Sequence, residues 1–311
     1  MSFPGPLVSA VVVNYNYGRF LRNAIDSALN QTYSNVEVIV VDDGSTDGSR
    51  QIVAAYGSRI IPVFKKNGGQ ASAFNAGFDK SKGDVICFLD SDDVWLPTKI
   101  EAVVAKSREK EDAVLIHHAY QRVDQNLLPF GKILPLSFLE GNVAEEVLRS
   151  GGCWPFPPPA AMAFRRSFLA SCMPIPEALF RSRAESCLAY CAPLWGPVAA
   201  IDEPLCLYRR HEGSDSVKLL HRTRLASVET YRLNVEGANL MLARTGRKER
   251  FCLHNHTSYL WAKYFAHEAD RPSWLKLCWN LVHAPAEPSW FLRVKMVVKF
   301  WVQSLGMREF S

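Results

Sequence analysis

The sequence predicts an α/β fold in which a parallel, doubly wound sheet is flanked by helices. Over the first 120 residues, short apolar runs alternate with longer amphipathic patterns. The apolar runs are nearly continuous, which is typical of strands buried on both faces. Each connection is long enough for a helical crossover, so successive units are expected to be right-handed βαβ units. These three observations place the chain in the α/β class.

Composition agrees with a packed globular protein. The 311 residues are 48% hydrophobic and 22% charged, a balance that excludes a disordered chain, a collagen-like chain and a strongly basic tail for nucleic acid. The length corresponds to one large domain or two small ones. No nucleic-acid partner is therefore expected.

Five strands and four helices are predicted in the first part of the chain. The strands are expected at residues 7–13, 36–41, 60–64, 85–89 and 113–116. The helices are expected at residues 19–29, 47–56, 71–80 and 97–110. Ser45, Thr46 and Asp47 supply N-capping side chains for the second helix. Pro97 suits the first turn of the fourth.

The pattern changes after residue 120. Residues 121–135 are predicted as a hairpin or loop excursion, and the proline-rich run at 154–159 excludes a helix. Residues 160–210 return to mixed structure and close with two short extended runs, at 198–201 and 205–208.

The last hundred residues or so are predicted to be helical. Apolar residues recur at spacings of three and four from Val217 to Leu242, which indicates one amphipathic face. Similar patterns occur at 274–282 and 290–305. The last of these has a basic polar face, which fits either a helix on an anionic membrane surface or ordinary packing on its own domain or a second subunit.

Cysteine use and charge indicate the compartment. The eight cysteines form no C-x-x-C pair, which favours a reducing cytoplasm over a disulfide framework. We find no signal-peptide pattern and no uncharged stretch long enough to span a bilayer. Acidic residues prevail before residue 205 and basic ones after it. We expect a cytoplasmic protein whose acidic first part binds a cation. Its basic second part is expected to contact either an anionic partner or the inner face of the plasma membrane.

Four polar clusters directly follow predicted strands. They span residues 14–18, 42–47, 67–70 and 90–93. In doubly wound sheets, ligands bind outside the carboxyl ends of the strands. The four clusters are therefore expected to line one crevice.

The acidic clusters indicate two kinds of contact. Asp90, Asp92 and Asp93 would repel one another unless a cation neutralised them, and Mg²⁺ or Mn²⁺ is the simple remedy. The alternative is a solvated acidic turn before the fourth helix. Asp42 and Asp43 can accept hydrogen bonds from a base edge or a ribose hydroxyl, or they can cap a helix, and both roles can hold together.

The four clusters in this order resemble the family 2 inverting glycosyltransferases of GT-A fold. The segments that carry the resemblance are V-V-V-N-Y-N, V-V-D-D-G-S-T-D, N-G-G-Q-A-S-A-F-N-A-G and G-D-V-I-C-F-L-D-S-D-D-V-W. The match is close over residues 7–95 and looser up to residue 211. It implies a nucleotide-sugar-binding part at 1–120, an acceptor-binding part at 121–212 and a helical C-terminal region at 213–311.

The resemblance also implies roles for individual residues. The implied donor-binding residues are Asn14, Asn16, Asp42, Asp43, Asn67, Gln70, Asp90, Asp93 and Arg209. Within this set Asp42 would contact the base and Asp90 the ribose. Asp92 would hold Mg²⁺ or Mn²⁺, with Asp90 beside it and His211 completing the metal shell.

Glu185 is the implied catalytic base. It stands in a run where the family more often has aspartate, and Glu177 and Asp202 are the other candidates. The alternative for Glu185 is a surface carboxylate paired with Arg181 or Arg183.

Three aromatic residues are expected on the acceptor side. Trp154 and Phe156 would form an acceptor wall, because aromatic rings suit the apolar faces of sugars. Trp95, directly after the acidic cluster, is expected at the donor or acceptor edge. The alternative for residues 154–159 is a plain proline-rich connector.

The resemblance implies metal-dependent inverting transfer from a nucleotide diphosphate sugar, most often a UDP-sugar, to a glycan or lipid-linked acceptor in cell-surface glycan synthesis. The C-terminal helices would contact a membrane surface or a second copy of the chain. Two rival functions are a non-catalytic nucleotide-sugar-binding scaffold and a nucleotidyltransferase. A nucleotidyltransferase should have a glycine-rich triphosphate-binding loop with a Lys or Arg near the first strand. Residues 14–19 match that pattern poorly.

Overall fold

The computed structural model describes residues 5–214, 224–266 and 272–282. Its strands are β1 (Val8–Asn14), β2 (Val36–Asp42), β3 (Ile61–Phe64), β4 (Val85–Asp90), β5 (Val94–Trp95), β6 (Leu115–Val123), β7 (Met162–Arg165) and β8 (Val198–Arg209). They form one sheet in the order β3-β2-β1-β4-β7-β6-β8-β5. β5 and β7 run antiparallel to their neighbours, and the other described strands run parallel. The predicted mostly parallel sheet is confirmed.

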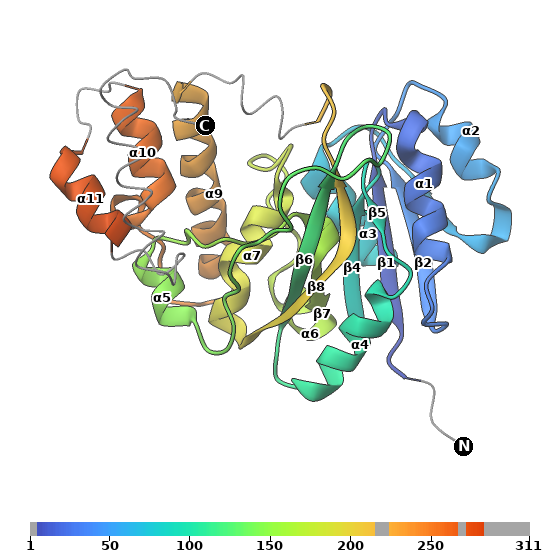
Figure 1. The fold of residues 1–311 in the computed structure, drawn as a ribbon, viewed down its shortest axis with the longest axis horizontal. Helices are drawn as coiled ribbons and strands as arrows, with labels where there is room; N and C mark the ends of the chain where they lie inside the picture. Colours follow the sequence, from blue (N-terminus) through green and yellow to red (C-terminus); the bar gives the residue numbers. More distant parts are fainter. Residues whose placement is uncertain (1–4, 215–223, 267–271, 283–311) are drawn as a thin grey trace.

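Helices cover the sheet and one end of the molecule (Figure 1). They are α1 (Gly18–Leu29), α2 (Ser49–Ala54), α3 (Gln70–Lys80), α4 (Lys99–Glu109), α5 (Ala144–Arg149), α6 (Arg166–Cys172), α7 (Ala184–Trp195), α9 (Arg224–Arg244), α10 (Thr257–Phe265) and α11 (Trp274–Val282), with short 3₁₀ turns at Gly57–Arg59, Pro159–Ala161 and Leu253–Asn255. In Figure 1, α9, α10 and α11 gather at the end farthest from α2.

The apolar strands are buried on both faces, which explains their nearly continuous apolar runs. On one face Val11 packs with Phe74 of α3 and Phe88 of β4, whose rings stack 4.0 Å apart. On the other face Val12 packs with Leu21 of α1 and with α4. Alternate residues of β1 thus enter two separate cores, one on each face of the sheet.

The predicted elements of the first part are present, mostly with ends shifted by one or two residues. Residues 121–123 continue β6 to Val123, and the chain then turns back along it, with antiparallel bridges Val123–Pro129 and Tyr120–Leu134, so of the two predicted alternatives for residues 121–135 the hairpin is confirmed. The two extended runs near residue 200 form the single strand β8, which follows the whole of β6 with register shifts on both sides of Ala119. β6 therefore crosses the predicted part boundary at residue 120, and both parts share one sheet.

Asp47 caps the starts of two helices. Its Oδ2 accepts a hydrogen bond from the amide of Gly18 at 2.9 Å, and its Oδ1 accepts one from the amide of Ser49 at 2.9 Å. The predicted capping role is confirmed for this residue. Pro97 lies before α4, which begins at Lys99, so its predicted place inside the first turn is wrong.

The predicted apolar face of the C-terminal region is buried where it is described. Val235, Ala238 and Leu242 of α9 pack in the same core as α7, so this face belongs to the interior. Residues 217–223 and the pattern at 290–305 lie outside the described residues. Among the described helices, none is both long and apolar enough to cross a membrane.

Candidate active site

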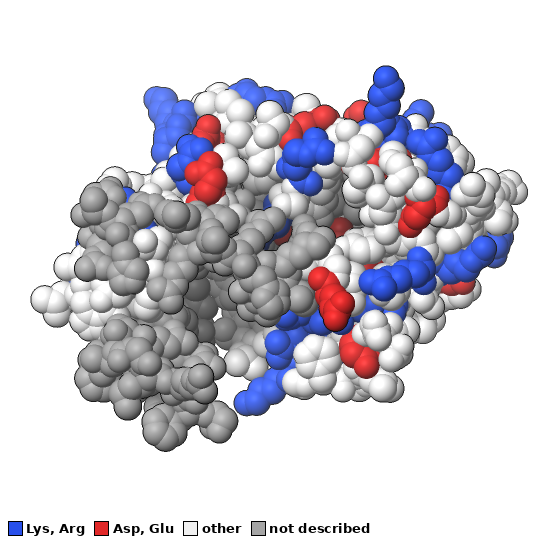
Figure 2. Space-filling view, turned by 90° about the horizontal axis from the view of Figure 1, so that it is seen from above, with Lys and Arg blue, Asp and Glu red and all other residues white. Residues whose placement is uncertain are grey.

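A cleft of about 840 Å³ lies at the carboxyl ends of β1, β2, β4, β6 and β8. We call its two sides the N-terminal wall (residues 13–17, 43, 67, 69, 70, 73 and 90–92) and the C-terminal wall (residues 120, 122, 134, 156–159, 181–183, 185, 208, 210, 213 and 214). Figure 2, seen from above, shows acidic and basic side chains interspersed on the described surface. The predicted crevice is therefore present at the sheet edge that the sequence indicated.

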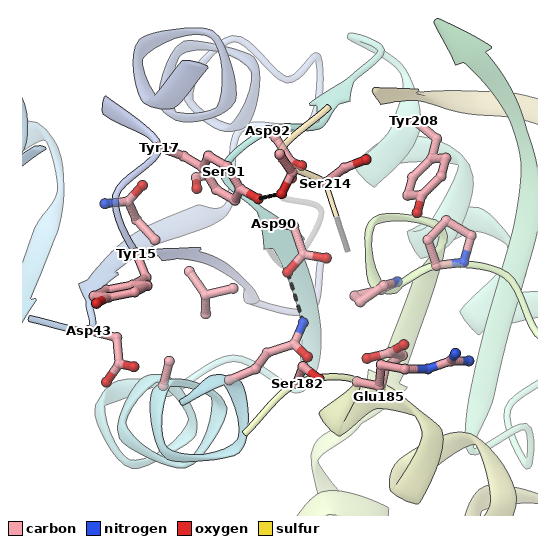
Figure 3. A pocket seen from close by; sticks show the side chains of 18 of the residues that line it. Tyr15, Tyr17, Asp43, Asp90, Ser91, Asp92, Ser182, Glu185, Tyr208 and Ser214 are labelled. Carbon is pink, nitrogen blue, oxygen red and sulfur yellow. Dashed lines mark hydrogen bonds between the residues drawn. The ribbon is translucent and has the colours of Figure 1, made fainter. Parts of the chain in front are cut away.

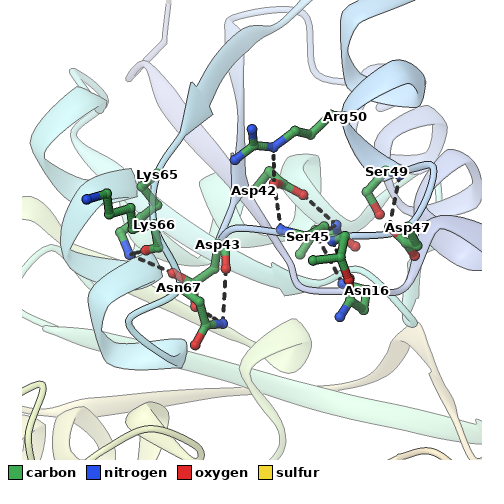
Figure 4. Close-up of polar contacts among 12 residues, drawn as sticks. Asn16, Asp42, Asp43, Ser45, Asp47, Ser49, Arg50, Lys65, Lys66 and Asn67 are labelled. Carbon is green, nitrogen blue, oxygen red and sulfur yellow. Dashed lines mark hydrogen bonds and ion pairs between the residues drawn. The ribbon is translucent and has the colours of Figure 1, made fainter.

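Asp42 lies behind the N-terminal wall rather than in it. Its carboxylate is wholly buried and accepts hydrogen bonds from Asn14 Nδ2 at 3.1 Å, the Ser45 amide at 3.0 Å and Arg50 Nε at 3.3 Å (Figure 4). It does not line the cleft. Because its oxygens are already used by the turn after β2, Asp42 shapes that turn and leaves its neighbour Asp43 facing the cleft.

Asp43 holds the loop between β3 and α3. Its carboxylate accepts from Lys65 Nζ at 2.6 Å, from Asn67 Nδ2 at 3.1 Å and from the amides of Gly68 at 2.9 Å and Gly69 at 2.7 Å. The next residue, Gly44, has φ +78°, and a Cβ there would lie 2.6 Å from the Asn67 nitrogen. Glycine at this position lets two distant loops meet.

The two asparagines after β1 differ in their contacts. Asn14 is buried, and its Oδ1 has no hydrogen-bond partner within the described part of the chain. Asn16 has φ +58°, and its Oδ1 accepts from the Thr46 amide at 2.8 Å. Both line the cleft together with the half-exposed Tyr15 between them.

Gln70 joins the two walls. Its Nε2 donates to Asp90 Oδ1 at 3.1 Å, and its Oε1 accepts from the Ala184 amide at 2.9 Å (Figure 3). The end of β4 and the start of α7 are thereby held at a fixed separation. Gln70 and Asp90 line the cleft, as does Glu185, the residue after Ala184.

The acidic turn after β4 presents Asp90 and Asp92 to the cleft and withdraws Asp93. Asp93 Oδ1 accepts from the Arg209 amide at 2.8 Å. Burial raises the pKa of Asp93 well above its usual range, and the charges of Asp92 and Asp90 raise it further. Asp93 therefore secures the turn from behind. It does not line the cleft, so the predicted contact between Asp93 and the sugar donor is wrong.

His211 orients Asp92. Its Nδ1 accepts from Arg19 Nη2 at 3.1 Å and from the Gly213 amide at 3.1 Å. Both partners can only donate, so the ring hydrogen lies on Nε2, which donates to Asp92 Oδ2 at 3.1 Å. In this arrangement His211 supports the Asp92 carboxylate, and its predicted place in a metal shell stays a prediction.

Arg209 lies behind the same turn. Its Nε donates to the Asp92 carbonyl at 2.6 Å and its Nη1 to the Gln125 carbonyl at 2.6 Å. The guanidinium also stacks over the Phe20 ring, with its carbon 4.3 Å from the centroid. Arg209 does not line the cleft, so its predicted donor contact is corrected too.

Glu185 is the one of the three candidate bases that lines the cleft. It lies in the first turn of α7, after Arg183 with φ +62°. In Figure 3 it lies on the opposite side of the cleft from Asp43, with Asp90 between them. Glu177 Oε1 instead accepts from Asn75 Nδ2, and Asp202 is exposed on β8.

Two of the predicted acceptor residues are buried, which corrects that prediction. Trp95 is 2% exposed and donates from Nε1 to the Ala160 carbonyl at 2.8 Å. Trp154 is 5% exposed and donates to the Ala189 carbonyl at 3.0 Å. That carbonyl would face the amide of residue 193 in a regular helix, but Pro193 has none, so the indole supplies the missing donor. Only Phe156 lines the cleft.

Several lining residues were not predicted. They are Tyr120, Arg122, Arg181, Ser182, Arg183, Tyr208 and Arg210. The rule that ligands bind at strand ends could have found Tyr208, which ends the extended run predicted at 205–208, and Arg210, which follows that run by two residues. It could not have found Tyr120 and Arg122, because the predicted strand stopped at residue 116.

Metal ligands are sparse in the protein itself. No three histidine, cysteine, aspartate or glutamate side chains converge on a common point within the described ranges. Asp90 and Asp92 are the carboxylates of the acidic turn that face the cleft. A divalent ion bound there would need further oxygen ligands from a substrate and from water.

Sequence comparison places the chain among transferases of sugars. A family model described as glycosyl transferase family 2 matches residues 9–172. An uncharacterized glycosyltransferase of Nostoc sp. is 32% identical over 287 residues, covering 88% of this chain and 86% of that one. Glycosyltransferase GlyG of Streptococcus pneumoniae is 35% identical over 156 residues, covering 48% of this chain and 52% of that one.

Solved structures share the fold. TarS 1-349 of S. aureus in complex with UDP-GlcNAc has a TM-score of 0.54 at 18% identity, covering 96% of this chain and 86% of that one. The mannosyltransferase PcManGT of Pyrobaculum calidifontis in complex with GDP-Man and Mn²⁺ has a TM-score of 0.52 at 17% identity, covering 97% and 81%. The GT-A fold that the motifs implied is confirmed.

Proposed function

The chain belongs to glycosyl transferase family 2, and we propose that it transfers a sugar from a nucleoside diphosphate sugar to an acceptor hydroxyl with inversion at the anomeric carbon. One observation carries this proposal. Asp90, Asp92 and Glu185 line a single cleft, with the acidic turn between Asp43 and Glu185. A cation-binding turn and a separate carboxylate are the two groups that such a reaction needs.

The donor is proposed to lie along the N-terminal wall. Asn14, Asn16, Asp43, Asn67 and Gln70 face the cleft there. TarS is solved with UDP-GlcNAc and PcManGT with GDP-Man. We propose a UDP-sugar as the donor, with a guanosine donor as the main competitor.

Mg²⁺ or Mn²⁺ would be held by Asp92, with Asp90 beside it. The ion would neutralise charge on the leaving diphosphate. Mg²⁺ keeps several water ligands and usually binds one or two carboxylates together with substrate phosphates. Two carboxylates that face the cleft, Asp90 and Asp92, therefore suit it. The hydrogen bond from His211 fixes the orientation of the Asp92 carboxylate before the donor arrives.

Glu185 is proposed to remove the proton of the acceptor hydroxyl as its oxygen attacks the anomeric carbon. Attack from the face opposite the diphosphate forms one bond while the other breaks, so no covalent intermediate on the protein is needed. The place of Glu185 across the cleft from Asp43 supports this division of roles.

We propose a glycan or lipid-linked acceptor of cell-surface glycan synthesis, reached at the inner face of the plasma membrane. The excess of basic residues after residue 205 supports contact with an anionic surface. A homodimer through the C-terminal helices is the alternative use of that region.

Calorimetry with UDP, GDP and dTDP, each with Mn²⁺ and then with EDTA, tests the donor site. We expect one diphosphate, UDP, to bind in the presence of Mn²⁺ and to lose that binding in EDTA. Absence of binding to all three by a folded protein would overturn the proposed function and favour a scaffold. Release of pyrophosphate from a nucleoside triphosphate would indicate a nucleotidyltransferase.

A further inference from the structure

The C-terminal wall contains a paired cluster of tyrosines and arginines at the ends of β6 and β8. Arg122 lies opposite Tyr208 in the strand ladder, and the Arg210 amide donates to the Val123 carbonyl at 2.8 Å. The rings of Tyr120 and Tyr208 meet edge to face, 5.6 Å apart. Because alternate residues of a strand share a face, these four side chains form one surface, and all four line the cleft.

Both arginines of this cluster have a donor without an acceptor. The Nε atoms of Arg122 and Arg210 are buried and have no hydrogen-bond partner in the part of the chain that the structure describes. Arg209 also has a buried Nη2 without a partner in the described ranges, but it does not line the cleft, and Arg181, which does, donates to Asn67. A buried N–H group without an acceptor costs free energy that a ligand with suitable oxygens recovers.

The position of Arg122 is set by the loop that follows β6. Its guanidinium carbon lies 5.6 Å from the centroid of the Phe130 ring. Gly131 has φ +69°, and a Cβ there would lie 2.7 Å from Arg122 Nη2. The left-handed backbone at Gly131 favours glycine, and the guanidinium packs closely against the loop there.

The two arginines act on the same group. Burial raises the pKa of Tyr120 to about 12, and the charges of Arg122 and Arg210 oppose that rise. Both guanidinium groups are thus within electrostatic reach of one phenol. Two positive charges and two phenols around one surface are well suited to an anion with several oxygens.

We propose that Arg122 and Arg210, with Tyr120 and Tyr208, bind a phosphate group carried by the acceptor. This proposal rests on the proposed function. Figure 3 shows Tyr208 on the same side of the cleft as Glu185 and opposite Asp43. The acceptor has to approach the proposed base, so a phosphate on this wall belongs to the acceptor, while the donor diphosphate lies at the acidic turn.

The loop after β6 also bears on the source of the phosphate. Leu128, Phe130, Ile133 and Leu136 are 63%, 42%, 46% and 61% exposed. Their neighbour Leu134 lines the cleft. A phosphate attached to a lipid would find this apolar surface beside the arginines, whereas a phosphate on a soluble saccharide would not use it.

The first test measures inorganic phosphate binding to the full chain while UDP and Mg²⁺ are kept saturating. We expect Arg122→Gln and Arg210→Gln each to weaken phosphate binding by about tenfold or more, the loss of one charge-assisted contact. UDP affinity should stay unchanged, which also shows that the variants are folded. The matched control is Arg59→Gln, an exposed arginine of the Gly57–Arg59 turn, which should bind phosphate as the parent protein does.

Two results would overturn the proposal. In one, the parent protein binds UDP but no phosphate, or both variants bind phosphate as tightly as the parent protein does. In the other, the variants lose UDP affinity, which would assign the arginines to the donor. Failure to bind UDP or the other diphosphates at all would overturn the proposed function instead.

The second test separates the two sources of phosphate. Binding is measured to phosphatidylcholine vesicles with and without a polyprenyl phosphate. Vesicle binding that needs the polyprenyl phosphate and is lost in the double variant Phe130→Ser/Leu136→Ser supports a lipid-linked phosphate. Phosphate binding without any vesicle binding supports a phosphorylated soluble saccharide. Vesicle binding that is equal without the polyprenyl phosphate and unaffected by Arg122→Gln contradicts the phosphate site.

Discussion

The two walls of the cleft are built in different ways. At the N-terminal wall, Asp43 and, directly behind it, Asp42 each accept hydrogen bonds from several donors within neighbouring turns. In the C-terminal wall, Arg122 and Arg210 keep buried donors without acceptors in the described part of the chain. The Asp42 and Asp43 carboxylates are thus already engaged by protein donors, and Asn14 Oδ1 and Ser91 Oγ are the buried side-chain atoms of the first wall without a partner in the described ranges, whereas the second wall keeps two charged donors unused. Side chains held in place before binding suit the wall proposed to bind the nucleotide sugar. Unused hydrogen-bond donors suit the wall proposed to bind the acceptor substrate.

Replacing Asp92 tests the N-terminal wall with the largest expected effect. Asp92→Ala removes the carboxylate proposed to hold the metal ion, and turnover should fall by about 10³-fold or more. UDP release from a UDP-sugar measures turnover, and calorimetry with Mn²⁺ and EDTA should show that the metal dependence of UDP binding is lost. Asp202→Ala, on an exposed part of β8, is the control and should retain both properties. Full metal-dependent binding by Asp92→Ala would contradict the assignment.

Replacing Glu185 tests the C-terminal wall at its proposed base. Glu185→Gln should lower kcat by about 10²-fold to 10⁴-fold, because general-base catalysis is lost while the shape is kept. Its affinity for UDP should be unchanged. Glu177→Gln is the matched control, since Glu177 bonds Asn75 away from the cleft. Turnover equal to that of the parent chain would remove Glu185 from the mechanism.

The difference between the walls also explains how far the sequence could be interpreted. Asp43, Asn67 and Asp90 stand in short segments directly after strands, and each segment folds into a turn of its own. Such local patterns can be recognised from sequence. The C-terminal wall joins β6, β8 and the start of α7, which are far apart in the chain, so no single segment contains its pattern.

Burial was harder to predict than position. Asp42, Asp93 and Arg209 were placed beside the correct strands, yet each lies one layer behind the cleft. The side chain next to each of them, Asp43, Asp92 and Arg210, lines it instead. Neighbouring residues of a turn or strand point in different directions, and only tertiary packing decides which of them faces the ligand.

Asp42→Ala tests whether the N-terminal wall depends on its buried carboxylate for folding. The substitution leaves Asn14 Nδ2, the Ser45 amide and Arg50 Nε without their acceptor, and should lower the free energy of unfolding by about 3 kcal/mol. Urea unfolding measures this. Asp79→Ala, on the exposed end of α3, should change stability by no more than about 0.5 kcal/mol. An Asp42→Ala protein of unchanged stability that fails to bind UDP would mean that Asp42 contacts the base after all.

The smallest expected effect comes from Trp154, which lies behind the C-terminal wall. Trp154→Phe keeps an aromatic ring but removes the donor to the Ala189 carbonyl, and should lower the free energy of unfolding by about 2 kcal/mol. Because Trp154 is buried, the KM for the acceptor should not change.

Pro193→Ala restores a backbone amide that can reach the same carbonyl. In the Pro193→Ala background, Trp154→Phe should lower the free energy of unfolding by less than it does in the parent protein. A double-mutant cycle of urea unfolding measures the difference between the two losses. An equal cost in both backgrounds would show that the indole stabilises α7 by packing alone, and a raised acceptor KM would return Trp154 to the acceptor wall.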